Sequence, residues 1–204
     1  MKILVASTTL AIGLASAACA SGLPEPQITP EPAVDRVEMV DWSGLYAGGG
    51  FSLYSGQRDY SSGAQYDMTG YTIDGIAGYR MQRGAWVYGG EVSYSSGEVA
   101  VDTNANYRFS NLADLRGQVG YSFGNALVFV AAGWSVGTWH ESTSFKNISK
   151  GMNAGIGVDF KVSDRSFVGA EYIYRQQSGQ YSPSPTSTFD TDIHALRVRA
   201  GFKF

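Results

Sequence analysis

The final segment of the chain, residues 194–204, alternates between apolar and cationic side chains and ends on an aromatic residue. Successive side chains of a β-strand point to opposite faces, so the pattern predicts one apolar and one positively charged face. The apolar face carries Leu196, Val198, Ala200, Phe202 and Phe204. The opposite face carries Ala195, Arg197, Arg199, Gly201 and Lys203. A strand with two such faces lies between an apolar environment on one side and a polar environment on the other.

The same alternation recurs along the chain after residue 44. Eight segments show it: 45–55, 70–80, 85–95, 112–122, 126–137, 150–160, 166–175 and 194–204. Each has roughly 10 residues, enough for a tilted strand to cross the hydrocarbon of a membrane. The fifth segment is ambiguous because residues 127–132 are apolar on both faces. We assign Val128, Val130, Trp134 and Val136 to its outward face.

The connections between these segments alternate in length. Residues 81–84, 123–125 and 161–165 form short ones, whereas residues 56–69, 96–111, 138–149 and 176–192 form long polar ones. Short turns at one end and long loops at the other are typical of bacterial outer-membrane barrels. The sequence therefore predicts an all-β fold, an eight-stranded antiparallel up-and-down transmembrane β-barrel. Its short turns and both termini would face the periplasm, and its four long loops would be extracellular.

Alternation alone does not say which face points outward. A soluble, lipocalin-like barrel would turn its apolar face inward. Two features favour lipid outside. Many positions on the polar face are glycine, which suits a narrow interior. The apolar faces also carry aromatic residues near strand ends, as interfacial girdles do: Tyr71, Tyr79, Trp86, Tyr94, Tyr121 and Tyr172.

The N-terminus has the pattern of a secretory signal peptide. Lys2 precedes an apolar run, residues 3–14, and small residues follow up to Ala20. We expect residues 1–20 to be removed, with cleavage after Ala20 or after Ala18. The second cut would leave Cys19 first, as in a lipoprotein, although Ser16 stands where a lipobox has Leu.

A Pro- and Glu-rich stretch follows the signal. Residues 21–41 cannot bury a core, and we expect them to form a periplasmic linker before the barrel, residues 42–204. The whole chain carries 15 Lys and Arg against 18 Asp and Glu, a net charge of -3. This mildly acidic balance argues against nucleic acid as a partner.

Several pieces of the sequence resemble a known superfamily. They are Trp42–Gly49, Leu115–Tyr121, Ala170–Tyr174 and the terminal strand. Together they resemble the small eight-stranded, OmpA-like and opacity-type outer-membrane proteins of Gram-negative bacteria, including the porin-like surface antigens of alphaproteobacteria. The resemblance implies contact with outer-membrane lipid, both lipopolysaccharide and phospholipid. It also implies that Phe202 and Phe204 belong to a C-terminal insertion signal read by the barrel-assembly machinery.

The polar faces offer a candidate charge network inside the barrel. Its members are Asp74, Arg80, Glu91, Asp114, Arg116, Asp159, Glu171, Arg175, Arg197 and Arg199. Neighbouring strands bring Glu91 near Arg116 and bring Glu171 near Arg197 or Arg199. Because buried charges must be paired, one interpretation is a salt-bridged plug that closes the lumen. The other is a narrow or gated path for ions or small solutes.

Enzymatic and cofactor-binding patterns are weak. The run His140-Glu141-Ser142 has the residue types of a hydrolase triad, but adjacent residues on an extended segment point in different directions. His194 lies on the apolar register, and Leu196 stands where a deacylase-type His-x-Ser motif has Ser. The chain has two His, which argues against a metal site. We therefore expect no enzymatic activity, metal or cofactor.

The long loops are the remaining candidate for recognition. They contain scattered aromatic residues among small polar ones, a composition suited to surface contacts: Tyr54, Tyr60, Tyr66, Tyr107, Phe109, Phe145, Tyr181 and Phe189. The hypothesis is a structural or surface barrel that supports envelope integrity or contacts an extracellular partner. A small porin-like channel is the alternative. Haem binding through Tyr60, Tyr66, His140 and Tyr181, or lipid A modification, is a weaker one.

Overall fold

The computed structural model describes residues 40–60, 65–101, 104–140, 146–180 and 188–204. This part of the chain consists of eight β-strands. They are β1 (Gly44–Tyr60), β2 (Gln65–Arg83), β3 (Trp86–Val101), β4 (Asn104–Phe123), β5 (Ala126–His140), β6 (Lys146–Lys161), β7 (Ser166–Gln180) and β8 (Thr188–Lys203). The expected signal peptide, and the expected linker up to residue 39, lie outside the described residues. Within these residues, no helix is long and apolar enough to cross a membrane.

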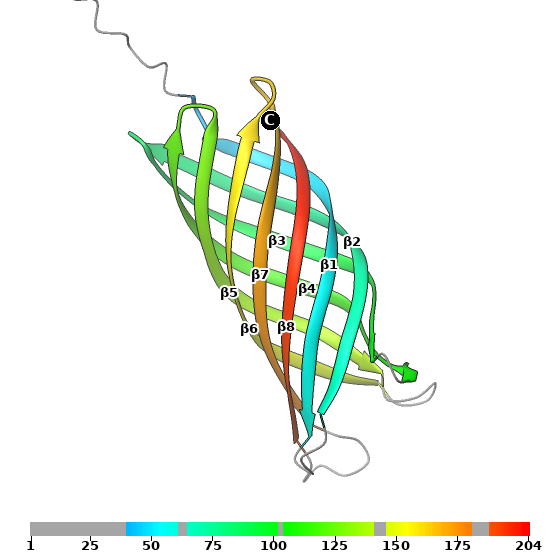
Figure 1. Ribbon diagram of the computed structural model, residues 1–204. Helices are drawn as coiled ribbons and strands as arrows, with labels where there is room; N and C mark the ends of the chain where they lie inside the picture. The colour runs from blue at the N-terminus through cyan, green and yellow to red at the C-terminus, as the bar shows by residue number, and fades with distance from the viewer. Residues whose placement is uncertain (1–39, 61–64, 102–103, 141–145, 181–187) are drawn as a thin grey trace, which may run out of the picture. The chain divides into compact units, whose positions relative to one another are not determined.

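The eight strands form a closed barrel (Figure 1). Each strand pairs antiparallel with the next, and β8 returns to pair with β1, where Phe51 faces Val198 and Leu53 faces Leu196. Closure leaves no strand edge unpaired, which a sheet in lipid requires. The expected eight-stranded antiparallel barrel is confirmed. The C-terminus lies at the same end as the short turns, and we call this the terminal end of the barrel.

The strands are longer than the apolar alternation indicated. They contain between 15 residues in β5 and 20 in β4, and they continue into the connections that we expected to be long loops. In β1, for example, Asp59 still pairs with Gln65 of β2. Backbone hydrogen bonds continue the ladder without an apolar face, so the polar sequence beyond the membrane does not end the strands. Of residues 56–69, only 61–64 fall between β1 and β2.

The two faces of the sheet have opposite character, as the alternation predicted. Large apolar side chains are exposed on the outside, with Ile73 70% and Trp134 68% accessible. Charged side chains lie inside, where Arg197 is 0% accessible. The ambiguous fifth strand follows the predicted register, because Val130 is exposed and Leu127 is buried.

Large inward side chains of the barrel lie against glycines of neighbouring strands. A Cβ atom at Gly157 would come within 2.5 Å of the Phe129 ring, and one at Gly78 would come within 2.5 Å of the Tyr46 hydroxyl. A small barrel has little interior volume, so these aromatic rings fit where the neighbouring strand lacks a side chain. Outward glycines are different, since a Cβ atom at Gly117 would meet nothing within 4 Å.

These contacts predict different effects of two Gly→Ala substitutions on the free energy of unfolding. Gly157→Ala should lower the free energy of unfolding by about 1–3 kcal/mol, because the new methyl group overpacks the interior against Phe129. Gly117→Ala, the matched control on the outer wall, should be neutral or slightly stabilising. Urea titration of the refolded protein in lipid vesicles, followed by heat-modifiable gel mobility, measures both effects. Equal midpoints for the two variants would contradict the packing argument.

Candidate functional site

The interior of the barrel holds a balanced set of ionisable side chains, which we call the charged belt. It comprises Asp74, Glu91, Asp114, Asp159 and Glu171 with Arg80, Arg116, Arg175, Arg197 and Arg199. All ten residues are at most 4% accessible. Each lies on the inward register of its strand, and the two signs are equal in number. These are the ten residues proposed from the sequence, and the barrel brings them together in its lumen.

Arg116 lies at the centre of the belt, between two carboxylates. Its Nη1 atom lies 2.5 Å from Oε1 of Glu171, and its Nη2 atom forms an ion pair with Glu91. Glu91 is the register partner of Arg116 on β3, whereas Glu171 reaches it from β7. One guanidinium therefore links β3, β4 and β7 across the lumen. Such a geometry uses the several N–H donors of arginine.

Arg199 and Arg80 extend the belt toward the terminal end. Arg199 Nη1 lies 2.9 Å from Glu91 Oε2 and 3.5 Å from Glu171 Oε2. Its Nε atom is 3.2 Å from Asp159. Arg80 Nη2 donates to the same Asp159 at 2.6 Å. Each of these carboxylates thus meets more than one arginine, so the ion pairs form a network.

Two further pairs extend the belt in the opposite direction. Arg175 Nη2 donates to Asp114 at 2.7 Å, and Arg197 Nε donates to Asp74 at 3.0 Å. Arg197 also lies 3.7 Å from Glu171, which connects this pair to the centre. The remaining lone pairs of the aspartates accept hydrogen bonds from neutral side chains. These donors are Ser52 and Thr72 on Asp74, and Ser93, Ser135 and Asn153 on Asp114.

Tyr46 is a member of the site that the sequence did not single out. Its hydroxyl donates to Glu91 at 2.8 Å and accepts from the amide of Gln118 at 2.9 Å. Ser52 and Ser135 were missed in the same way. The available signal is their position, since each occupies the inward register of its strand with the charged residues.

Apolar clusters lie on both sides of the belt along the barrel. The first, which we call the terminal cap, contains Trp42, Tyr46, Ile76, Val87, Leu127, Phe129, Ala131 and Phe167. The second, which we call the distal cap, contains Tyr54, Met68, Val99, Leu112, Ile173, Ile193 and Ala195. Tyr54 corrects an expectation, because it was assigned to a recognition loop and is only 4% accessible. It lies inward on β1, with the Arg175 guanidinium 5.5 Å from its ring centroid.

Arg80 joins the charged belt to the terminal cap. Its guanidinium carbon lies 4.6 Å from the ring centroid of Tyr46 and 5.2 Å from that of Phe167. The rings of Trp42 and Phe129 are each 5.7 Å away. Aromatic faces attract cations, and guanidinium groups stack on them readily. The arginine is thereby accommodated among apolar residues while it keeps its ion pair with Asp159.

The segment Val40–Ser43, which we call the strap, places Trp42 in the terminal cap. Trp42 is 3% accessible, and its indole N–H donates to the Ser122 hydroxyl at 3.1 Å. The carbonyl oxygen of Asp41 accepts from Lys161 at 2.6 Å and from Lys203 at 2.9 Å. Partial burial alone would raise the pKa of the Asp41 carboxyl. Hydrogen bonds from Ser43 and Lys203, with the charge of Lys203, outweigh it and lower that pKa.

Of the four residues considered for haem, the side chains of two, Tyr66 and His140, are described, and these two lie on different strands. Tyr66 lies on β2 with an exposed side chain, and His140 lies on β5, where its Nε2 atom is 2.8 Å from the Ser110 hydroxyl. Tyr181 and the side chain of Tyr60 lie outside the described residues, as do Glu141 and Ser142. Among the residues that are described, no three His, Cys, Asp or Glu side chains are grouped as metal ligands.

For the other aromatic residues that the sequence places in the loops, the structure does not describe the side chains. The backbones of Tyr107, Phe109 and Phe189 belong to strands, but their side chains lie outside the described set, as does Phe145. His194 is exposed on the outer face, as its register indicated, and its Nδ1 atom is 2.6 Å from the Tyr172 hydroxyl.

Comparisons with known proteins agree with this architecture. The family model described as "Outer membrane protein beta-barrel domain" matches residues 8–204. The 25 kDa outer-membrane immunogenic protein of Brucella canis is 26% identical over 214 residues, covering 100% of this chain and 98% of the relative. The Brucella abortus protein of the same name is 25% identical with the same coverage.

Solved structures also share the fold. Neisserial surface protein A superposes with a TM-score of 0.52 at 16% identity, covering 79% of this chain and 98% of that one. Ail, the attachment invasion locus protein of Yersinia pestis, superposes with a TM-score of 0.50 at 11% identity, covering 79% and 99%. The chain therefore belongs to the outer membrane protein beta-barrel domain family and lies in a bacterial outer membrane, with its apolar outer wall in contact with lipid.

Proposed function

We propose that this protein is a closed, structural surface barrel whose lumen is plugged by the charged belt. In this role it would support envelope integrity or contact an extracellular partner through the four connections at the end opposite the terminal end, which we call the distal end. Both termini would lie in the periplasm, after removal of residues 1–20, with residues 21–41 as a linker. The proposal assigns no enzymatic activity to the protein.

The observation that carries the proposal is the arrangement of the belt between two apolar caps. A permeating ion would have to pass the terminal cap, separate paired charges such as Arg116 and Glu171, and then pass the distal cap. Separating a buried pair leaves an uncompensated charge in a medium of low dielectric constant, at a cost of several kcal/mol. Selective pores instead tend to use rings of one sign, whereas the two signs are balanced here.

One observation favours the alternative, a narrow porin-like channel. The side-chain amide of Gln177 and the hydroxyl groups of Thr191 and Ser95 are buried without a protein hydrogen-bond partner. Buried polar groups without protein partners are usually hydrated. Gln177 and Thr191 are register partners on β7 and β8, so a water-filled stretch on the distal side of the belt would connect them. Such a stretch becomes a path only if the belt opens.

Surface exposure is supported by the relatives. The Brucella proteins are named immunogenic, and the Yersinia protein is named for attachment and invasion. Lipopolysaccharide and phospholipid would surround the outer wall, and the barrel-assembly machinery would read the terminal strand. Phe202 and Phe204 fit this signal, because both are exposed and their rings lie 5.5 Å apart. Haem binding and lipid A modification have no comparable support.

The belt predicts different costs for the same substitution at two positions. Glu91→Gln should lower the free energy of unfolding by about 3–5 kcal/mol, because Arg116 and Arg199 lose a buried countercharge. Glu98→Gln is the matched control, since Glu98 pairs with Arg108 but its side chain is 61% accessible. Its cost should be about 0–1 kcal/mol. Urea titration in lipid vesicles measures both, and similar costs would argue against a structural role for the belt.

The closed lumen predicts no current. The refolded mature protein should give no conductance in planar bilayers, because the two caps and the belt leave no aqueous path. A well-characterised porin in the same bilayers shows that the assay detects channels, and heat-modifiable mobility shows that the silent protein is folded. Steady single-channel currents whose conductance changes in the Glu91→Ala variant would contradict the plug proposal and support the channel alternative.

The proposed orientation predicts which end of the barrel is accessible on cells. In a Cys19→Ala background, a membrane-impermeant maleimide should label Asp59→Cys on intact cells, because Asp59 is exposed at the distal end. Asp164→Cys is the control, since Asp164 is exposed in the turn between β6 and β7 at the terminal end. It should react only after the outer membrane is permeabilised. The reverse pattern would place the termini outside.

A further inference from the structure

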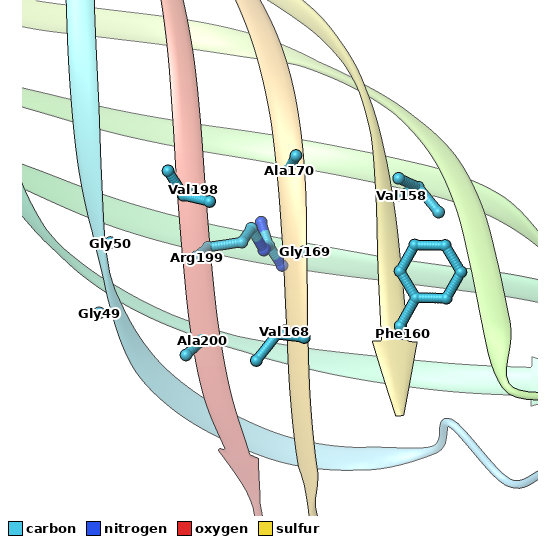
Figure 2. Close-up of a pocket in the computed structure, with 10 residues that line it drawn as sticks. All are labelled: Gly49, Gly50, Val158, Phe160, Val168, Gly169, Ala170, Val198, Arg199 and Ala200. Atoms are coloured by element: carbon cyan, nitrogen blue, oxygen red, sulfur yellow. The ribbon is translucent and has the colours of Figure 1, made fainter. Parts of the chain in front are cut away.

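The outer wall of the barrel has a hollow near its terminal end. Figure 2 shows this groove, which has a volume of about 500 Å³ and extends over β1, β8, β7 and β6. Its lining residues are Gly49, Gly50, Val158, Phe160, Val168, Gly169, Ala170, Val198, Arg199 and Ala200. Arg199 contributes little polarity to the lining, because it is 3% accessible and its guanidinium is paired inside the barrel.

The groove results from small residues at outward positions of adjacent strands. Gly49 of β1 pairs with Ala200 of β8, and Ala170 of β7 pairs with Val198 of β8. On the β6 side the next outward residue is Phe160, which is 49% accessible and pairs with Val168. The floor of the groove therefore consists of the small residues Gly49, Ala170 and Ala200. Larger apolar side chains, including Phe160 and Val198, lie beside it.

The occupant follows from the position of the groove. It is continuous with the apolar wall that contacts lipid in the outer membrane, and its lining offers almost no hydrogen-bonding group for water. A second barrel would meet this wall with a broad convex surface, which fits a narrow hollow poorly. A single hydrocarbon chain is narrow enough to lie along the floor between Phe160 and Val198, where it would gain dispersion contacts over those on a flat wall.

We propose that this groove is a binding site for one acyl chain of a phospholipid, drawn from the leaflet at the terminal end of the barrel. With the termini in the periplasm, as proposed above, this is the inner leaflet of the outer membrane. Small side chains on the floor let an acyl chain approach the barrel backbone closely, which increases its van der Waals contacts with the wall. The bound phospholipid exchanges more slowly than its neighbours in the surrounding shell.

Native mass spectrometry of the mature protein, purified from outer membranes in mild detergent, tests the site. The spectrum should show one retained phospholipid per chain. Ala170→Leu should reduce the retained fraction at least tenfold, because the larger side chain fills the floor. Ala77→Leu is the matched control, since Ala77 is an exposed outward alanine of β2, a strand that contributes no residue to the lining of the groove. It should retain the lipid as the unmodified chain does.

Three results would overturn the site. Equal lipid retention by the Ala170 and Ala77 variants would show that the lipid is merely part of the surrounding shell. Retention of lipopolysaccharide instead of phospholipid would place the groove in the other leaflet. A dimer that dissociates on Ala170→Leu would assign the groove to a second copy. Heat-modifiable mobility verifies that each variant is folded, and Ala200→Leu repeats the test should the Ala170 variant fail to fold.

Discussion

The interior of this barrel is organised by the need to neutralise arginine. A guanidinium removed from water in a narrow lumen is tolerated only when carboxylates and hydrogen-bond acceptors replace its hydration. Arg116 meets this need with Glu91 and Glu171, and Arg199 shares both carboxylates and adds Asp159. Because these residues come from five different strands, satisfying the charges also fixes how the strands face one another across the lumen.

The aromatic residues and glycines follow from the same constraint on volume. Long arginine side chains fill the middle of the lumen, so bulky rings lie where the neighbouring strand has a glycine. Phe129 over Gly157 and Tyr46 over Gly78 are such places. Arg80 shows that the two kinds of packing overlap, because it is paired with Asp159 and surrounded by the rings of the terminal cap. The charged belt and the terminal cap therefore form one continuous core.

Much of the fold could be predicted from the sequence, since a period of two in a membrane strand determines which face each side chain occupies. The pairing of Glu91 with Arg116 follows from neighbouring strands alone. Tyr46 could not be assigned in this way, because its hydroxyl reaches Glu91 from a strand that is not its neighbour. Tyr54 was wrongly assigned to a loop, although it falls within the alternating segment 45–55 and shares the inward register of Ser52. Hydrogen bonding continues β1 to Tyr60, beyond the point where lipid shapes the sequence.

The strap has a consequence for the order of assembly. Trp42 donates a hydrogen bond to Ser122 at the end of β4, and its ring centroid lies 6.4 Å from that of Phe167 on β7. Its backbone amide also donates to Gln82 of β2. Because β2, β4 and β7 are not neighbours in the sheet, the full set of Trp42 contacts requires the curled barrel. We therefore expect Trp42 to dock late in folding, so that the environment of its indole distinguishes a closed barrel from an inserted but open sheet.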